Sequence, residues 1–139
     1  MDKEKVLKVC NALVKGNLME TLNIEFVDVG EDFLSARMPV TNKVHQIHGI
    51  LHGGATVALA ETVGSAAVSV LTQDSSVSVV GIEISANHLK SVSNGYVTAT
   101  AKPIRMGKII QLMEIRVTDE EGNLISHCKL STFTPPKNK

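Results

Sequence analysis

The feature that most constrains the fold is an apolar segment in the middle of the chain. Between Lys43 and Asp74 the sequence consists mainly of Ala, Val, Leu and Gly, and Glu61 is the only residue there with a formal charge. The part from His52 to Ser65 has the pattern of a helix that is apolar on nearly every side, and such a helix is normally buried. We therefore predict one long central helix inside the protein.

The carboxylate of Glu61 is the unusual group on this helix. An ionised carboxylate in an apolar environment is unfavourable unless something compensates it. Burial would also raise its pKa toward the range of a general base, which makes the residue a candidate for catalysis. A structural glutamate with a satisfied partner would give the same pattern, so the residue alone leaves both interpretations open.

Length and composition predict a single domain over residues 1–139, with a core that needs no disulfide or metal. Lys plus Arg (14) balances Asp plus Glu (14), so the composition does not favour nucleic acid or an anionic membrane surface as a partner. Cys10 and Cys128 form neither a disulfide framework nor a CxxC motif, which favours the cytoplasm. The segment 49–71 is long enough to cross a membrane, but its small residues and its charge favour a core helix instead.

Periodicity predicts an α+β domain. A short amphipathic helix over 6–14 ends before Gly16, and a long loop over 41–51 leads to the central helix. An antiparallel sheet must cover its apolar face, and the central helix is the only large apolar element available, so we expect the sheet to wrap around it. The predicted strands are 24–29, 33–40, 77–89, 96–104, 109–118 and 124–134.

A family resemblance covers nearly the whole chain. The segment from Gln46 to Ser65, with its HGG motif at His52, its Glu61 nine residues later and a Gly-Ser pair, resembles the signature of hotdog-fold acyl-CoA thioesterases in the phenylacetate-degradation and hydroxybenzoyl-CoA branch. The segment from Val80 to Lys90 is similar to the strand by which such proteins contact coenzyme A. The resemblance implies hydrolysis of an acyl-CoA to a carboxylate and free coenzyme A, without a cofactor.

Thioester hydrolysis needs a base or nucleophile beside the carbonyl carbon and donors aimed at the developing oxyanion. Gly53 stands where the central helix begins, so its N–H is one of the unpaired donors at the positive end of the helix dipole. Glu61 can attack the thioester directly or draw a proton from water, and both roles stay open. We expect Gln46 to orient the water or the carboxylate, His52 to hold the loop or the thioester oxygen, and Ser65 to contact Glu61 from the next turn.

The phosphates of coenzyme A need local cations. We assign substrate binding to two groups of residues, with ordinary solvated strand-end and hairpin residues as the alternative interpretation. The two groups are Val80, Asn87, His88, Leu89 and Lys90 in one strand, and Arg105, Met106, Gly107 and Lys108 at a hairpin.

A distance argument predicts an oligomer. Gly53 and Glu61 are eight residues apart, which in a helix is roughly 12 Å along the axis. One helix therefore cannot present both groups to one carbonyl, whereas two antiparallel copies can. We predict a homodimer, and the resemblance implies further pairing to a homotetramer in many cases.

The sequence disfavours three alternatives. The spacing of His45, His48 and His52 does not form a metal site if these residues lie in a loop, so we predict none. A hotdog hydratase would need a catalytic histidine loop of a type that this chain lacks. A non-catalytic acyl-CoA sensor would usually carry a DNA-binding domain. The acyl group stays open between aromatic and medium-chain, because the chain holds only three Phe, one Tyr and no Trp to line a pocket.

Overall fold

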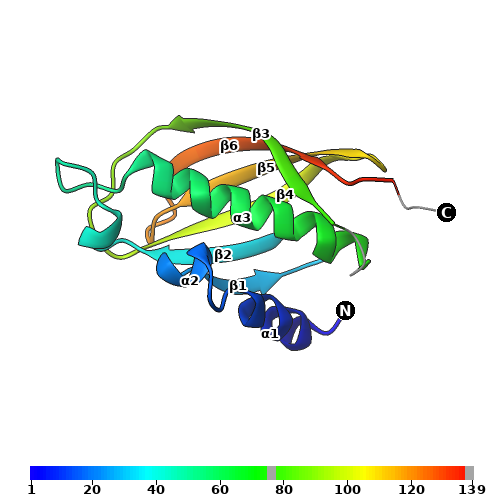
Figure 1. Ribbon diagram of the computed structural model, residues 1–139. Coiled ribbons are helices and arrows are strands. Elements are labelled where there is room, and N and C mark those ends of the chain that lie inside the picture. Colours follow the sequence, from blue (N-terminus) through cyan, green and yellow to red (C-terminus); the bar gives the residue numbers. More distant parts are fainter. Residues whose placement is uncertain (75–77, 137–139) are drawn as a thin grey trace.

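The computed structural model describes residues 1–74 and 78–136, which form a six-stranded antiparallel sheet wrapped around one long helix (Figure 1). The strand order is β1-β2-β4-β5-β6-β3. The elements are α1 (Lys3–Leu13), α2 (Leu18–Thr21), β1 (Glu25–Val29), β2 (Leu34–Pro39), the 3₁₀ turn η1 (Asn42–Val44), α3 (Gly53–Thr72), β3 (Val80–His88), β4 (Tyr96–Met106), β5 (Ile110–Thr118) and β6 (Leu124–Phe133). The predicted α+β architecture is confirmed.

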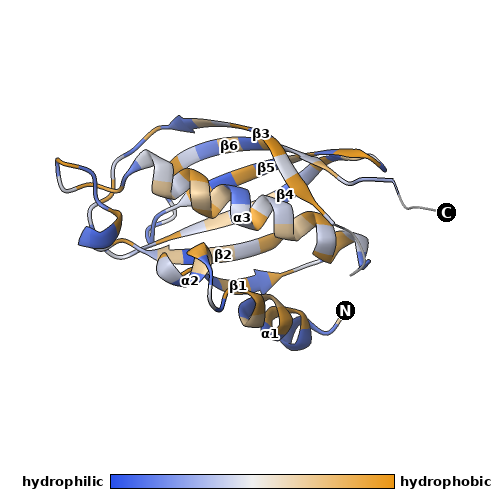
Figure 2. Cartoon of the chain, in the orientation of Figure 1, coloured by the Kyte–Doolittle hydropathy of each residue, from blue (hydrophilic) through white to orange (hydrophobic). Residues whose placement is uncertain are grey.

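Helix α3 is the central helix that the apolar segment predicts. His52 caps its first turn, and Gln73 ends it in the left-handed conformation with a φ of 55°. By length and composition alone α3 could cross a membrane, but it lies against one face of the sheet, and its ribbon is coloured mostly from neutral to hydrophobic (Figure 2). It is therefore the core helix of the fold. Its buried residues are Thr56, Leu59, Ala60, Val63, Gly64, Ala67 and Val68.

Close packing of α3 on the sheet depends on Gly64. A Cβ atom at this position would lie 2.6 Å from Cδ2 of Leu130 on β6 and 3.2 Å from Cδ1 of Ile115 on β5. Both of these side chains are fully buried, so neither has free space into which to move. The absence of a side chain at Gly64 thus lets the helix approach the centre of the sheet.

The two edges of the sheet differ. At β1, the side chain of Asn11 on α1 donates to the carbonyl of Phe26 (3.0 Å) and accepts from its N–H (2.8 Å), so α1 covers this edge. At the other edge, β3 pairs only with β6 within residues 1–74 and 78–136. Its apolar side chains Val80 and Ile82 are exposed. A long open edge strand is a ready surface for pairing with another strand.

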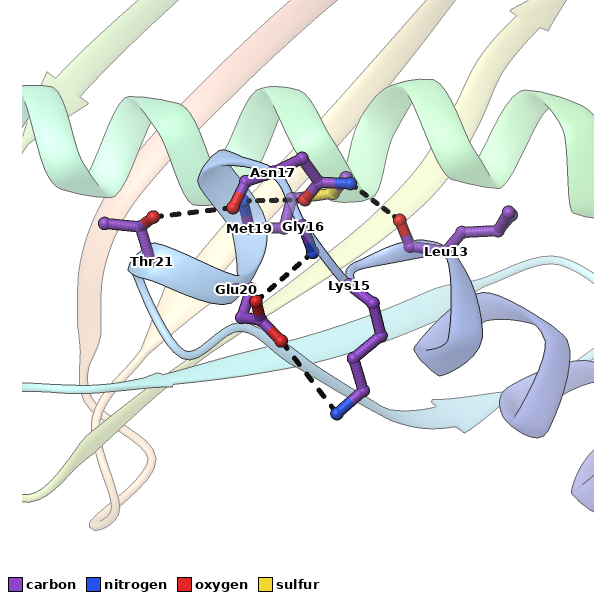
Figure 3. A network of polar contacts seen from close by, with 7 residues as sticks. All are labelled: Leu13, Lys15, Gly16, Asn17, Met19, Glu20 and Thr21. Atoms are coloured by element: carbon purple, nitrogen blue, oxygen red, sulfur yellow. Dashed lines mark hydrogen bonds and ion pairs between the residues drawn. The ribbon is translucent and has the colours of Figure 1, made fainter.

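The short helix α2 was not predicted. Asn17 caps it by accepting from the N–H of Met19 (3.1 Å), and Glu20 accepts from the N–H of Gly16 (3.2 Å) (Figure 3). Asn17 also donates to the carbonyl of Leu13 at the end of α1, which joins the two helices through one side chain. An Asn followed three residues later by Glu is a helix-start signal, and it was overlooked because the helix is only one turn long.

All six predicted strands are present, and their ends differ from the prediction by at most three residues. The predicted start of the third strand at Val77 lies outside the described residues, and β3 begins at Val80. Strand β4 continues through Met106 beyond its predicted end at Ile104, because pairing with β5 resumes after an irregularity between Pro103 and Arg105. The predicted loop 41–51 contains the 3₁₀ turn η1, which was also missed.

The packing of α3 predicts which leucine matters for stability. Leu59 on α3 is fully buried, so we expect Leu59→Ala to lower the free energy of unfolding by about 2–5 kcal/mol. The matched control is Leu13→Ala at the end of α1, where the side chain is 68% exposed, and we expect a change within about 0.5 kcal/mol. Urea denaturation at one fixed protein concentration measures both. Equal losses in the two variants would contradict this packing.

Candidate active site

The first turn of α3 presents an unpaired donor. Gly53 is the first residue of the helix, and its N–H has no acceptor in the part of the chain that the structure describes. The N–H groups of the next residues are occupied, since Gly54 donates to Nδ1 of His52 and Ala55 to the carbonyl of His52. The N–H of Gly53 is thus the free donor of this turn, at the positive end of the dipole. The predicted helix start is confirmed.

A cavity of about 300 Å³ opens beside this turn. Gly53 and Thr56 line it from α3, His88 from the end of β3 and Ser126 from β6. The His88 ring lies directly against the glycine, because a Cβ atom at Gly53 would come 2.7 Å from Nε2 of His88. The other ring nitrogen, Nδ1, is 2.7 Å from the hydroxyl of the fully buried Ser126. A small ligand in this cavity can therefore meet a backbone N–H and an imidazole together.

The carboxylate of Glu61 lies two turns further along α3, against β3. Its Oε2 would be 2.7 Å from a Cβ atom at Gly81, so the carboxylate lies directly over this glycine of β3. The sequence predicts a carboxylate on a buried helix, and in a single chain the Glu61 side chain is half-buried and faces the open edge of the sheet. It makes no hydrogen bond or ion pair within residues 1–74 and 78–136. It is thus an unpaired carboxylate at the boundary of the core.

Within one chain, Gly53 and Glu61 occupy different parts of the structure. Gly53 lies against His88 at one end of β3, whereas Glu61 lies against Gly81 near the other end. The cavity beside Gly53 is not lined by Glu61. This arrangement agrees with the sequence argument that one helix does not present both groups to the same carbonyl.

The structure gives His52 and Gln46 structural contacts. The His52 ring caps α3, with Nδ1 accepting from the N–H of Gly54 at 2.8 Å. Gln46 closes the loop before the helix. Its side-chain oxygen accepts from the backbone N–H of His48, and its own backbone N–H donates to the carbonyl of Ile50 (2.8 Å). Gln46 also lines the cavity beside Gly53, so one face of it is available to a ligand. His52 does not line that cavity.

Ser65 is half-buried on α3, one turn beyond Glu61. No hydrogen bond joins the two side chains in the described structure, so the predicted contact between them is not formed in a single chain. His45, His48 and His52 line an open hollow beside the loop. Among the residues described, no group of three His, Cys, Asp or Glu side chains is close enough to hold a metal ion.

The predicted coenzyme A residues are divided between the two ends of the sheet, with residues 87–90 at one end and Val80 and residues 105–108 at the other. His88 at the end of β3 pairs with Ser126, whereas Val80 at its start pairs with Phe133, which in turn pairs with Ile110 beside the β4–β5 hairpin. The hairpin residues 105–108 are therefore at the Val80 end of the molecule, away from the start of α3 (Figure 1). Within one chain Val80 therefore lies near the hairpin, whereas residues 87–90 are far from it.

Lys90 already has a partner. Its ammonium lies 3.6 Å from the carboxylate of Asp119 in the β5–β6 turn. Hydrogen bonds from the Asn123 side chain and from backbone N–H groups, together with the charge of Lys90, hold the pKa of the Asp119 carboxyl below its usual value. Asp119 therefore stays ionised to a lower pH than an unperturbed aspartate, and a phosphate would have to compete with it for this cation. Lys108 and Arg105 are exposed and make no ion pair within the described residues.

Ser126 is a site residue that the sequence interpretation missed. It occupies the same face of β6 as Cys128 and Leu130, which are fully buried. Alternation along a strand predicts apolar residues on such a face, so a serine there is the signal that could have identified it. Gly81 was missed for a different reason, since nothing in the sequence shows that a side chain from α3 lies over it.

Comparison with known proteins gives the family. A family model described as "Thioesterase superfamily" matches residues 48–126, more than half of the chain. A proofreading thioesterase, EntH, of Cronobacter turicensis is 44% identical over 130 residues, which are 94% of each chain. The 1,4-dihydroxy-2-naphthoyl-CoA hydrolase of Escherichia coli is 41% identical over 131 residues, covering 94% of this chain and 96% of the other.

Solved structures agree with these relatives. SAV0944 of Staphylococcus aureus, called a thioesterase, superposes with a TM-score of 0.82 at 34% identity over 87% of this chain and 100% of the other. The chain therefore belongs to the thioesterase superfamily and has the hotdog fold. The predictions of the fold and of a thioester hydrolase are confirmed.

The capping contact of His52 predicts that this residue contributes to stability. We expect His52→Ala to lower the free energy of unfolding by about 1 kcal/mol, because the N–H of Gly54 loses its acceptor. His52→Asn should restore most of that loss, since Asn is a good N-cap residue. Thermal or urea unfolding of the three proteins checks this. Asn and Ala variants of equal stability would show that the cap is not what the ring contributes.

Proposed function

We propose that the protein hydrolyses an acyl-CoA thioester at two equivalent sites, each built from Gly53 of one chain and Glu61 of a second copy. One observation carries this proposal. Both residues lie against the same edge strand, Gly53 at the His88 end and Glu61 at the Gly81 end, and this edge is open in the described structure. When β3 pairs antiparallel with β3 of a second copy, the Gly81 end of one strand lies beside the His88 end of the other.

The pairing can be specified from the register. If the two-fold axis passes near Ile84 and Ser85, the middle of β3, then Gly81 of one chain lies opposite His88 of the other. Glu61, which lies over Gly81, then faces the cavity beside the second copy's Gly53. Both groups stand on the α3 face of the sheet, so a continuous sheet keeps them on the same side. A dimer is the smallest assembly with this geometry, and pairing of dimers into a tetramer is compatible with it.

In such a site the chemistry divides between the two chains. The N–H of Gly53 donates to the thioester oxygen and stabilises the negative charge that develops when the carbonyl carbon becomes tetrahedral. Glu61 of the other chain either takes the proton of an attacking water or attacks the carbon itself to give a mixed anhydride that water then opens. In both routes the carbon–sulfur bond breaks, and coenzyme A leaves as a thiolate that takes up a proton. No cofactor is needed.

The relatives support the assignment of residues and substrate. The two S. aureus structures are variants in which alanine replaces a glutamine in one and a glutamate in the other, at positions fifteen residues apart, the separation between Gln46 and Glu61 in this chain. The name of the E. coli relative specifies an aromatic acyl group on coenzyme A. We therefore favour an aromatic acyl-CoA, with medium-chain acyl-CoA as the second candidate.

The proposed dimer also brings predicted coenzyme A residues of the two chains close together. In a single chain residues 105–108 lie at the Val80 end of the sheet, and residues 87–90 lie at the other end. Two-fold pairing of β3 brings the hairpin of one chain to the side of the sheet that carries the other chain's Gly53. The unpaired cations Arg105 and Lys108 are then the better candidates for the phosphates, since Lys90 is held by Asp119. Two buried, unpaired thiols agree with a cytoplasmic location.

Removal of the carboxylate tests the reaction. We expect Glu61→Gln to fold normally and to lower kcat for benzoyl-CoA by about 10²–10⁴-fold, because the amide is neither a base nor a nucleophile. Glu31→Gln in the exposed β1–β2 turn is the matched control and should keep the wild-type rate. Release of free thiol from a panel of aryl- and alkyl-CoA thioesters measures activity and acyl preference together. Glu61→Gln protein with most of its activity would remove this residue from the mechanism.

Mixing two inactive variants tests whether the site is shared. Gly53→Ala should be inactive, because its Cβ would come within 2.7 Å of His88 and close the oxyanion position. A heterodimer of Gly53→Ala and Glu61→Gln chains contains one site with neither change. Subunit exchange at equal concentrations should therefore restore about a quarter of the wild-type rate, since half of the dimers carry one intact site out of two.

The control for this experiment is each variant exchanged with itself, which should stay inactive. A mixture without recovered activity, in which mass spectrometry detects heterodimers, would show that Gly53 and Glu61 do not act across the subunit interface.

A further inference from the structure

The imidazole of His88 has a tautomer that its surroundings fix. Its Nδ1 lies 2.7 Å from the hydroxyl of Ser126, and the hydroxyl is fully buried. If Nδ1 carried the proton, it would donate to this oxygen, and the serine O–H would be left without an acceptor among the residues described. An unpaired buried donor is costly, so the serine donates to Nδ1 instead. The proton of the neutral ring then belongs on Nε2.

Nε2 faces the site. This nitrogen is the atom that a Cβ at Gly53 would meet at 2.7 Å, and both residues line the cavity of about 300 Å³ at the start of α3. Nε2 makes no hydrogen bond within residues 1–74 and 78–136. The ring is exposed in a single chain, so a ligand can reach it. The cavity thus contains two free donors side by side, the N–H of Gly53 and Nε2–H of His88.

We infer that His88 is a catalytic residue that donates through Nε2–H a second hydrogen bond to the thioester oxygen bound by Gly53, and that Ser126 is the positioning residue that holds it in this form. The inference rests on the proposed hydrolysis of a thioester and adds the second oxyanion donor to it. A single backbone N–H leaves the oxyanion able to accept further hydrogen bonds. A neutral imidazole donor next to the glycine supplies one of them without introducing a fixed charge.

This assignment changes the role predicted for His88. The strand end 87–90 is expected from the sequence to contact coenzyme A, and on that expectation replacement of His88 would raise KM. A donor to the developing oxyanion acts mainly in the transition state, so its loss lowers kcat instead. The two roles therefore differ in the kinetic parameter that responds.

Kinetics of a small set of variants tests the inference. We expect His88→Ala to lower kcat by about 10²–10³-fold with little change in KM. Ser126→Ala should lower kcat by a smaller factor, and Ser126→Thr, which keeps the hydroxyl, should restore it. His127→Ala is the matched control, because this histidine pairs with Glu114 (2.7 Å) on the outer face of the sheet and should leave kcat unchanged.

The tautomer is measured independently of activity. In ¹⁵N-labelled protein, the chemical shifts of the His88 ring nitrogens should show the proton on Nε2, and Ser126→Ala should abolish this preference. A proton on Nδ1 in the wild type overturns the inference, as does a His88→Ala variant with an unchanged kcat. If wild-type protein hydrolyses thioesters and His88→Ala does so equally well, this inference fails and the proposed function stands. A wild type without thioesterase activity on any CoA ester overturns both.

Discussion

The structure depends on how one carboxylate is accommodated on an otherwise apolar helix. A helix with the composition of α3 must be covered by a sheet, and Glu61 cannot enter the dry interior without a partner. The fold places this residue where the sheet ends, over a glycine of the last strand, so the charge stands between the core and the exterior. The same helix begins at a glycine whose N–H is unpaired. The core helix therefore also carries both groups of the proposed site, which lie apart in one chain.

Much of the fold follows from the sequence because the relevant interactions are local. The 3.6-residue and two-residue periodicities identify α1, α3 and all six strands, and the turns between strands are marked by glycine or by Asp and Asn. Elements of one turn, α2 and η1, carry too few residues to produce a period. Their signals are confined to short cap patterns, Asn17 followed by Glu20 for α2 and Thr41 for η1.

The site was predictable only in part. The HGG motif and the helix start place the oxyanion donor, since the free N–H of a first helical turn is a property of the helix itself. The sequence did not predict that Glu61 is only half-buried. Its burial depends on which strand lies at the edge of the sheet, and strand order is a long-range property. The hydrogen bond between His88 and Ser126 could not be predicted from the sequence for the same reason. These residues are 38 positions apart and meet only through the pairing of β3 with β6.

The unequal edges of the sheet determine how far association can proceed. Asn11 occupies the backbone N–H and carbonyl of Phe26 on β1, so another strand cannot add there without displacing α1. Strand addition is thereby confined to β3, and a two-fold contact uses that edge in both copies at once. In the proposed dimer the pairing of β3 would leave no second open edge, so strand addition would end with one pair of chains. Asn11 thus blocks one of the two edges at which another strand could add to the sheet.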